Sequence, residues 1–341
     1  MPKINVLVAG STGYIGIQLI KILTNHKKVN IKYLCGSSSI GKNITFYDNF
    51  FRNKKLPKII KFNKKFLKEV DVIFTALPNG ESQKISKFLL KKNVLIDLAA
   101  DFRLKTAGDF LKWYKIKHLV PNKIKESIYA LPELKRNHIK KFKIISCPGC
   151  YPTSILLPLV PLLKNNLVNN QNIIIDSKSG YSGAGRAVHK KFKNRNLYES
   201  LSAYGLAVHR HNSEIQQELD ILTSKVNRFQ FTPHLTPMFR GILSTIYLDL
   251  KKGVSLNAVN KLLNKTYKNE NFVNIVQPNT FLSTNDVINT NNCLISVCKS
   301  KFNNKIIILS AIDNLIKGGS GQAVQNMNIY FGFKEKEGLS D

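Results

Sequence analysis

A glycine-rich turn near the amino end of the chain limits the possible folds more than any other feature. It is Gly10-Ser-Thr-Gly-Tyr-Ile-Gly16, and it directly follows the apolar run Ile4–Ala9. The next residues, Tyr14–Leu23, have the apolar periodicity of a helix, and Ile31–Cys35 is extended again. Strand, turn, helix and strand in this order make one βαβ unit. Such a unit predicts a parallel sheet of the doubly wound kind.

The alternation of strands and helices continues to about residue 150 and then changes. Before that point, the expected elements are strands at Val70–Leu77, Val94–Leu98 and Lys143–Ser146 and a helix around Glu81–Lys91. Beyond it, strands are expected at Asn172–Asp176, Gln230–Thr232, Ile242–Leu250 and Lys305–Ala311. Helices are expected there at Tyr151–Leu163, Ser213–Thr223, Leu256–Thr266 and, with an amphipathic pattern, Asn314–Tyr330.

Two domains follow from this change in pattern. We expect an α/β protein with a Rossmann-type parallel sheet over residues 1–149 and an α+β catalytic domain over 150–313. The second domain should hold a mixed or antiparallel sheet and the contacts for oligomerisation. The C-terminal helix, 314–341, is expected to complete the first domain. A length of 341 residues suits two domains of ordinary size.

The charge of the chain is strongly positive, and it favours anionic partners. Lys and Arg number 52 against 21 for Asp and Glu, which gives a formal net charge of +31. The lysines are spread along the chain in doublets such as Lys27–Lys28 and Lys140–Lys141, so we expect no nucleic-acid footprint. No apolar run reaches the roughly 18 residues that span a bilayer, and no signal peptide precedes the first strand. We therefore expect a cytoplasmic protein without a membrane partner.

The first turn and the end of the second strand indicate a dinucleotide cofactor. A glycine turn that opens a helix presents backbone N–H groups and the positive helix end to a pyrophosphate. An acidic residue after the second strand would favour NAD. Cys35 is instead followed by Gly36, the three hydroxyls of Ser37–Ser39 and, nearby, Lys42. We therefore expect NADP(H), bound by the first domain.

The cysteine usage indicates thiol chemistry. The chain has five cysteines, an odd number, and two of them form Cys147-Pro-Gly-Cys150 ahead of an apolar helical run. A cysteine at the start of a helix is favoured as the thiolate, which is the nucleophilic form. The same C-x-x-C spacing also occurs in dithiol oxidoreductases and in half of a zinc site. A second convincing C-x-x-C pair is absent from the sequence, so we expect no metal.

Histidines and arginines supply the remaining candidates for a reactive site. His209 and His211 point to the same side of an extended segment, and either is a candidate acid/base near neutral pH. Guanidinium groups bind carboxylate and phosphate in a bidentate way, and each also commonly serves in a structural ion pair. The candidate substrate-binding arginines are Arg103, Arg186, Arg210 and Arg240.

Taken together, the sequence resembles the N-acetyl-gamma-glutamyl-phosphate reductases, NADPH-dependent enzymes of arginine biosynthesis within the aspartate-semialdehyde dehydrogenase-like group. The resemblance runs from end to end and rests on many ordered segments rather than on one motif. They are Gly10–Gly16, Ile96–Leu104, Tyr129–Leu134, Pro148–Thr153, Asp176–Arg186, His209–His211 with Glu214–Ile215, Phe231–Met238 with Arg240–Gly241, and Asp313–Gly318 with Gly321–Asn326.

The resemblance implies roles for particular residues. It implies Cys150 as the nucleophile and His211 or His209 as the acid/base. The implied cofactor residues are Gly10, Ser11, Thr12, Gly13, Tyr14, Ile15, Gly16, Ser37, Ser38, Ser39, Ser182, Gly183 and Asn314. The sequence departs from the family pattern at Asn79, where His is usual, Cys147 (Asn), Ser154 (Ala or Gly) and Ser213 (Pro). None of these departures removes the nucleophile or the histidines.

The implied reaction is the reduction of N-acetylglutamyl 5-phosphate to N-acetylglutamate 5-semialdehyde through a thioester on Cys150, with release of phosphate. One alternative is a reductase of another acyl phosphate, of the aspartyl or aminoadipyl type. A second, from a different class, is a Cys147/Cys150 dithiol oxidoreductase. The resemblance also implies a homo-oligomer, either a dimer or a tetramer.

Overall fold

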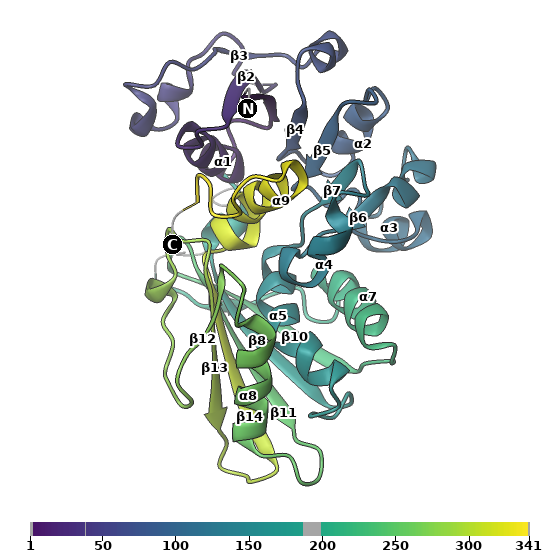
Figure 1. Cartoon of the computed structure of the whole chain (residues 1–341), viewed down its shortest axis with the longest axis vertical. Helices are drawn as coiled ribbons and strands as arrows, with labels where there is room; N and C mark the ends of the chain where they lie inside the picture. Colours follow the sequence, from purple (N-terminus) through teal and green to yellow (C-terminus); the bar gives the residue numbers. More distant parts are fainter. Residues whose placement is uncertain (1–2, 38, 187–198, 340–341) are drawn as a thin grey trace. The chain divides into compact units, whose positions relative to one another are not determined.

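The computed structural model describes residues 3–37, 39–186 and 199–339, which divide into two compact units (Figure 1). The first unit consists of the described residues of Met1–Pro148 and Gly319–Ser340. The second unit is built from Gly149–Gly318. Over the described residues, each unit contains one sheet of seven strands.

The sheet of the first unit is parallel throughout its described strands. Its order is β3-β2-β1-β4-β5-β7-β6. Because the chain leaves β1 towards β2 on one side and returns to β4 on the other, the strand order reverses beside β1, where doubly wound sheets bind ligands. The bounds are β1 (Ile4–Ala9), β2 (Val29–Cys35), β3 (Ile59–Ile60), β4 (Val72–Thr75), β5 (Val94–Asp97), β6 (Ser127–Tyr129) and β7 (Ile144–Ser146).

The continuous apolar sequence of β1 reflects burial on both faces of this sheet. Val6, Leu7 and Val8 are all fully buried, as expected for a parallel strand with helices on either side. Helix α1 adds Leu19 and Ile20 to the same core. The described α-helices of this unit are α1 (Tyr14–Thr24), α2 (Glu81–Ser86), α3 (Ala107–Tyr114), α4 (Pro132–Ile139) and α9 (Gly321–Phe331).

The sheet of the second unit is mixed. Its order is β12-β13-β14-β11-β8-β10-β9, with parallel pairing between β8 and β10 and between β12 and β13, and antiparallel pairing elsewhere. The strands are β8 (Ile173–Gly180), β9 (Ser202–Ala203), β10 (Phe229–Thr236), β11 (Ile242–Asp249), β12 (Val273–Ile275), β13 (Cys293–Lys299) and β14 (Lys305–Ile312). Helices α5 (Cys150–Lys164), α7 (His211–Thr223) and α8 (Leu256–Tyr267) pack with it. The expected α/β class with one parallel and one mixed sheet is confirmed.

Helix α5 is the central helix of the second unit and is buried from Tyr151 to Leu163. It contains Pro161, which has no N–H to give to the carbonyl of Leu157 one turn earlier. The hydroxyl of Tyr267 on α8 donates to that carbonyl instead, at 2.5 Å. The carbonyl of Leu157 therefore keeps a donor although Pro161 supplies none, and the helix continues through Pro158 and Pro161 to Lys164.

The C-terminal helix differs from the expectation for 314–330 and for 314–341. It begins at Gly321, because the N–H of Gly318 donates to the carbonyl of Asp313 (2.9 Å) and the chain forms a wide π-helical turn, Ile316–Ser320, first. Its pattern is also not amphipathic in the usual sense. Asn326 and Asn328 are fully buried, and their side chains donate to backbone carbonyls of the first unit. Over the described residues, no helix combines the length and apolarity needed to cross a bilayer.

Candidate active site

The glycine turn of the first unit joins β1 to α1 and has no room for side chains. Gly10 has a left-handed backbone (φ +86°), and a Cβ atom there would lie 2.2 Å from the carbonyl oxygen of Ala76. A Cβ atom at Gly16 would lie 2.1 Å from the carbonyl oxygen of Gly10. The chain therefore turns tightly into α1, and the positive end of the helix dipole is at the turn.

A pocket of about 750 Å³ lies beside this turn, at the carboxyl ends of β1 and β2. Gly10, Gly36 and Ser37 line it, and so do two cations, Lys61 and Lys84. A helix start and two ammonium groups around one pocket favour a ligand with phosphate groups. These residues fit the pyrophosphate and sugar portion of a dinucleotide.

The basic residue expected beside the second strand lies elsewhere. The Nζ atom of Lys42 lies 4.1 Å from the centre of the Phe46 ring, and Lys61 lines the pocket in its place. The reason is the two-residue strand β3, which pairs in parallel with β2. Because parallel strands end at the same edge of a sheet, the residue after β3 arrives at the pocket.

The serines expected to bind the cofactor differ in their surroundings. The hydroxyl of Ser11 is buried and donates to the carbonyl of Cys35 (3.1 Å). Ser39 is 2% exposed, and its hydroxyl is hydrogen bonded to that of Tyr47. These two hydroxyls therefore hold the loop together. Ser38 lies outside the described residues.

In the second unit, Cys150 is the first residue of α5. Gly149 occupies the cap position with an extended backbone (φ −66°, ψ 157°) and provides no side-chain cap. Cys150 is half-buried, and none of the five cysteines, all of which lie within the described residues, forms a disulfide. The positive end of the helix dipole favours the thiolate form of a cysteine at this position.

The imidazole of His211 lies directly against the residue that precedes this cysteine. A Cβ atom at Gly149 would lie 2.4 Å from Nε2 of His211, so only glycine allows this approach. Glu214, fully buried on the same face of α7, accepts the N–H of Gly149 (3.0 Å) through Oε2. Its Oε1 lies 3.8 Å from Nε2 of His211. Histidine, glutamate and the cysteine loop thus form one cluster.

The second histidine has a different environment. Nδ1 of His209 accepts the backbone N–H of His211 at 3.2 Å. Its ring packs edge-on against those of Tyr151, Tyr204 and Phe231, with centroid separations of 5.6, 5.4 and 5.7 Å. This burial, together with the nearby charge of Arg210, lowers the pKa of His209 to about 4. His209 is therefore neutral at physiological pH and acts as an acceptor.

Two tyrosines complete this aromatic cluster. The hydroxyls of Tyr151 and Tyr204 are 3.2 Å apart, and that of Tyr151 also donates to the carbonyl of His234 (3.2 Å). Burial raises the pKa of Tyr204 to about 12 and raises the pKa of Tyr151 as well. Both phenols stay protonated at neutral pH, so neither serves as a base there.

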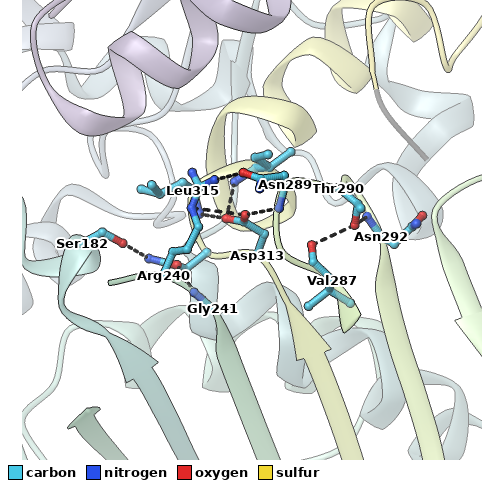
Figure 2. A network of polar contacts seen from close by, with 11 residues as sticks. Ser182, Arg240, Gly241, Val287, Asn289, Thr290, Asn292, Asp313 and Leu315 are labelled. Carbon is cyan, nitrogen blue, oxygen red and sulfur yellow. Dashed lines mark hydrogen bonds and ion pairs between the residues drawn. The ribbon is translucent and has the colours of Figure 1, made fainter. Parts of the chain in front are cut away.

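The three cofactor residues expected in the second unit lie together. Nδ2 of Asn314 donates to the hydroxyl of Ser182 (2.9 Å), and its Oδ1 accepts the N–H of Gly241 (2.7 Å). Figure 2 labels Ser182 and Gly241. A Cβ atom at Gly183 would be 3.7 Å from the same amide nitrogen. Asn314 thus fixes the loop after β8 to the start of β11.

The four candidate arginines do not share one environment. Nε of Arg240 lies 3.4 Å from Oδ2 of Asp313, which makes Arg240 a member of a structural ion pair (Figure 2). Arg103 belongs to the first unit and is 8% exposed. Arg186 and Arg210 belong to the second unit and are exposed. A role in substrate binding stays a prediction for all four.

Sequence reasoning assigned no role to several residues that shape this cluster. The contact of Glu214 with His211 could have been predicted from the sequence, since residues three positions apart lie on one face of a helix. Gly318 had no such sequence signal. A Cβ atom there would lie 2.6 Å from Cβ of Cys150, a contact between residues far apart in the sequence. The position of Asp313 likewise depends on the tertiary structure.

Comparison with known proteins covers nearly the whole chain. Residues 5–142 match the family described as semialdehyde dehydrogenase, NAD binding domain, and residues 150–314 match semialdehyde dehydrogenase, dimerisation domain. A protein of Vesicomyosocius okutanii is 44% identical over 98% of both chains. One of Thermoanaerobacter pseudethanolicus is 45% identical, again over 98% of both. Both relatives are named N-acetyl-gamma-glutamyl-phosphate reductase.

Solved structures share the fold at much lower identity. Aspartate semialdehyde dehydrogenase II of Vibrio cholerae, complexed with ASA, superposes with a TM-score of 0.74 at 16% identity, covering 97% of this chain and 99% of that one. The Candida albicans aspartate semialdehyde dehydrogenase with NADP gives 0.67 at 17% identity, covering 96% and 98%. With a cysteine at a helix start, an adjoining histidine and full-length relatives at more than 40% identity, the chain belongs to the N-acetyl-gamma-glutamyl-phosphate reductase family.

Proposed function

We propose that this chain reduces N-acetylglutamyl 5-phosphate to N-acetylglutamate 5-semialdehyde, a step of arginine biosynthesis, with NADPH as the reductant. The observation that carries the proposal is the full-length similarity to reductases of that name. The local chemistry supports it, since Cys150 begins α5 and His211 lies against the preceding glycine. This arrangement suits the attack of a thiolate on an acyl carbon.

In the proposed mechanism, the Cys150 sulfur forms a bond to the acyl carbon, and the bond from that carbon to the phosphate oxygen breaks. The products of this step are a thioester and inorganic phosphate. NADPH, when bound, supplies the hydride that reduces the thioester carbon. His211 gives a proton to the carbonyl oxygen as it gains charge and removes it again when the hemithioacetal collapses to aldehyde and thiolate.

The pocket of the first unit supports NADPH as the cofactor. Gly10 and Gly16 keep the turn open to a pyrophosphate, and Lys61 and Lys84 line the same pocket. Lys84 is already paired with Glu81 at 2.6 Å. We therefore assign the 2′-phosphate of NADPH, which NADH lacks, to Lys61.

Replacing Lys61 with methionine should raise the KM for NADPH about 10-fold, because a charge-assisted hydrogen bond contributes about 1.5–3 kcal/mol. The KM for NADH should change little. Lys42→Met is the matched control, since Lys42 lies over Phe46, and it should leave both values near those of the unchanged protein. Steady-state kinetics with the two nucleotides provide the measurement. An equal rise in both KM values would mean that Lys61 does not bind the 2′-phosphate.

The reaction itself is tested most directly in reverse. Purified protein should reduce NADP with N-acetylglutamate semialdehyde only when phosphate or arsenate is present, because the thioester must be released to an oxyanion. Absorbance at the wavelength of the reduced nicotinamide measures the rate. Phosphate-independent oxidation of the aldehyde contradicts the proposal. Higher kcat/KM on the aspartyl or aminoadipyl semialdehyde would indicate the alternative acyl phosphates.

The dithiol alternative is disfavoured by the state of Cys147. Its thiol is 1% exposed, and burial raises its pKa to about 12. The amide of Asn326 lies 3.8 Å from the sulfur. A thiol in this environment is a poor partner for disulfide exchange with other proteins, which needs an accessible thiolate.

We further infer a homo-oligomer. The second unit matches a domain described by its role in dimerisation. Along β8 and β11, alternate residues are buried, and the side chains between them include Ile174 and Tyr247, which are 44% and 41% exposed. The same face also carries Asp176, Lys178 and Thr245, and a mixed apolar and polar face of this kind suits contact with a second copy.

A further inference from the structure

The segment that follows β14 connects the neighbourhood of Cys150 to a buried carboxylate. Asp313 is fully buried, and its carboxylate receives groups from three parts of the second unit. Oδ1 accepts the backbone N–H groups of Leu315 (2.8 Å) and Ile316 (3.2 Å). Oδ2 accepts the N–H of Asn289 (2.8 Å) and lies 3.4 Å from Nε of Arg240 (Figure 2). All four of these partners are donors.

Asp313 also closes the turn through its backbone. Its carbonyl accepts the N–H of Gly318 at 2.9 Å, so the side chain holds the first part of the turn and the main chain holds the last. The conformation of the residues between them is set by this one position. Two of the turn residues, Asn314 and Gly318, have contacts that matter for the chemistry.

Gly318 forms one wall beside the reactive cysteine. A Cβ atom at this position would lie 2.6 Å from Cβ and 3.1 Å from Cα of Cys150, so the backbone at residue 318 is in direct contact with the cysteine. Asn314, at the other end of the turn, bonds to Ser182 and Gly241 as described above. A shift of the turn would therefore move both the cysteine wall and the loop after β8.

We infer that Asp313 is a positioning residue for Cys150: its charge, neutralised by Arg240, fixes the turn that packs Gly318 against the cysteine. The inference rests on the proposed function for its effect on turnover, but the geometry of the thiol tests it separately. Arg240 acts through Asp313 in this scheme.

The asparagine variant, Asp313→Asn, tests the charge with little change in volume. The NH₂ group of the asparagine amide replaces one of the two carboxylate oxygens. It therefore faces N–H groups that have lost their acceptor, and the ion pair with Arg240 is lost. We expect kcat to fall about 100-fold, the cost of a displacement of about 1 Å at a reacting group. The KM for NADPH should change less than about threefold. The rate at which iodoacetamide alkylates Cys150, followed by peptide mass spectrometry without substrate, should also change severalfold.

Two further variants separate positioning from general stability. Asp249→Asn is the matched control, because it breaks an ion pair with Lys305 at the far end of β11 and β14. It should change thermal stability without changing kcat or alkylation. Gly318→Ala adds a methyl group against Cys150 and leaves the carboxylate intact. It therefore tests the contact between the turn and the cysteine if Asp313→Asn does not fold. It should change the alkylation rate as Asp313→Asn does.

The double variant with Arg240→Met tests whether the two residues act together. Its kcat should be close to that of Asp313→Asn alone, since both changes act on the same turn. Multiplying losses would mean that Arg240 works independently, as a substrate-binding residue would, and would overturn its assigned role. Unchanged alkylation of Cys150 in both Asp313→Asn and Gly318→Ala overturns the inference, whatever the substrate. Absence of reductase activity in the unchanged protein would count against the proposed function alone.

Discussion

Replacing Cys150 with serine is expected to reduce kcat by at least about 10⁴-fold, the largest effect of any single change in this chain. Serine keeps the volume and the helix start, but its hydroxyl does not ionise near neutral pH and cannot supply the strong nucleophile. Steady-state rates with the acyl phosphate and NADPH measure the loss. Mass spectrometry of the unchanged protein, quenched with substrate and without NADPH, should show an acyl group on Cys150.

Cys147→Ser provides the control within the same segment. Cys147 is buried and its thiol has a pKa of about 12, so it takes no part in the proposed step. Its serine variant should keep at least about a third of the activity, since a hydroxyl also accepts from the nearby amide of Asn326. Loss of activity in Cys147→Ser equal to that in Cys150→Ser would favour the dithiol function instead.

Replacing His211 with glutamine should lower kcat by about 10²–10⁴-fold, the usual contribution of a positioned acid/base. Glutamine is similar in length and hydrogen bonding but does not transfer protons at neutral pH. Initial rates at neutral pH with the acyl phosphate and NADPH provide the measurement.

His209→Asn separates the two histidines. The Oδ1 atom of asparagine can accept the N–H of His211 in place of Nδ1, so the backbone contact is kept. Because the pKa of His209 is about 4, this histidine is neutral at physiological pH and has no proton to give as an imidazolium there. Its variant should lose less than about 10-fold in kcat. A larger loss in His209→Asn than in His211→Gln would reverse the assignment.

Local signals in the sequence were sufficient for the fold class and for the start of α5. The strand expected at Ile4–Ala9 has those bounds, and the helix expected at Tyr151–Leu163 runs from Cys150 to Lys164. In both cases an apolar run adjoins a turn that contains glycine or proline, and the pattern that predicts the element lies within about 15 residues. The strand Cys293–Lys299 was not predicted, although Ile295 and Val297 have strong strand preference.

The details of the site depended on contacts between distant residues. Strand β3 has only two residues and is too short to show an alternating pattern. The position of Lys61 at the pocket therefore follows only from the pairing of β3 with β2. The late start of α9 has a similar cause. The backbone hydrogen bond from Gly318 to Asp313 closes a wider turn than an α-helix has, so the α-helix begins only after this turn. The choice between His209 and His211 needed the burial of each ring, which depends on Tyr151 and Phe231.

The main chain of Gly318 contacts Cys150, and the main chain of Gly149, the residue before the cysteine, contacts the ring of His211. Surfaces made of backbone do not change when neighbouring residues are exchanged for others. The abundant lysines of this chain, with its charge of +31, therefore leave these two contacts unaltered. The surroundings of the cysteine at Gly318 and Gly149 thus depend on the path of the backbone and not on the composition of the chain.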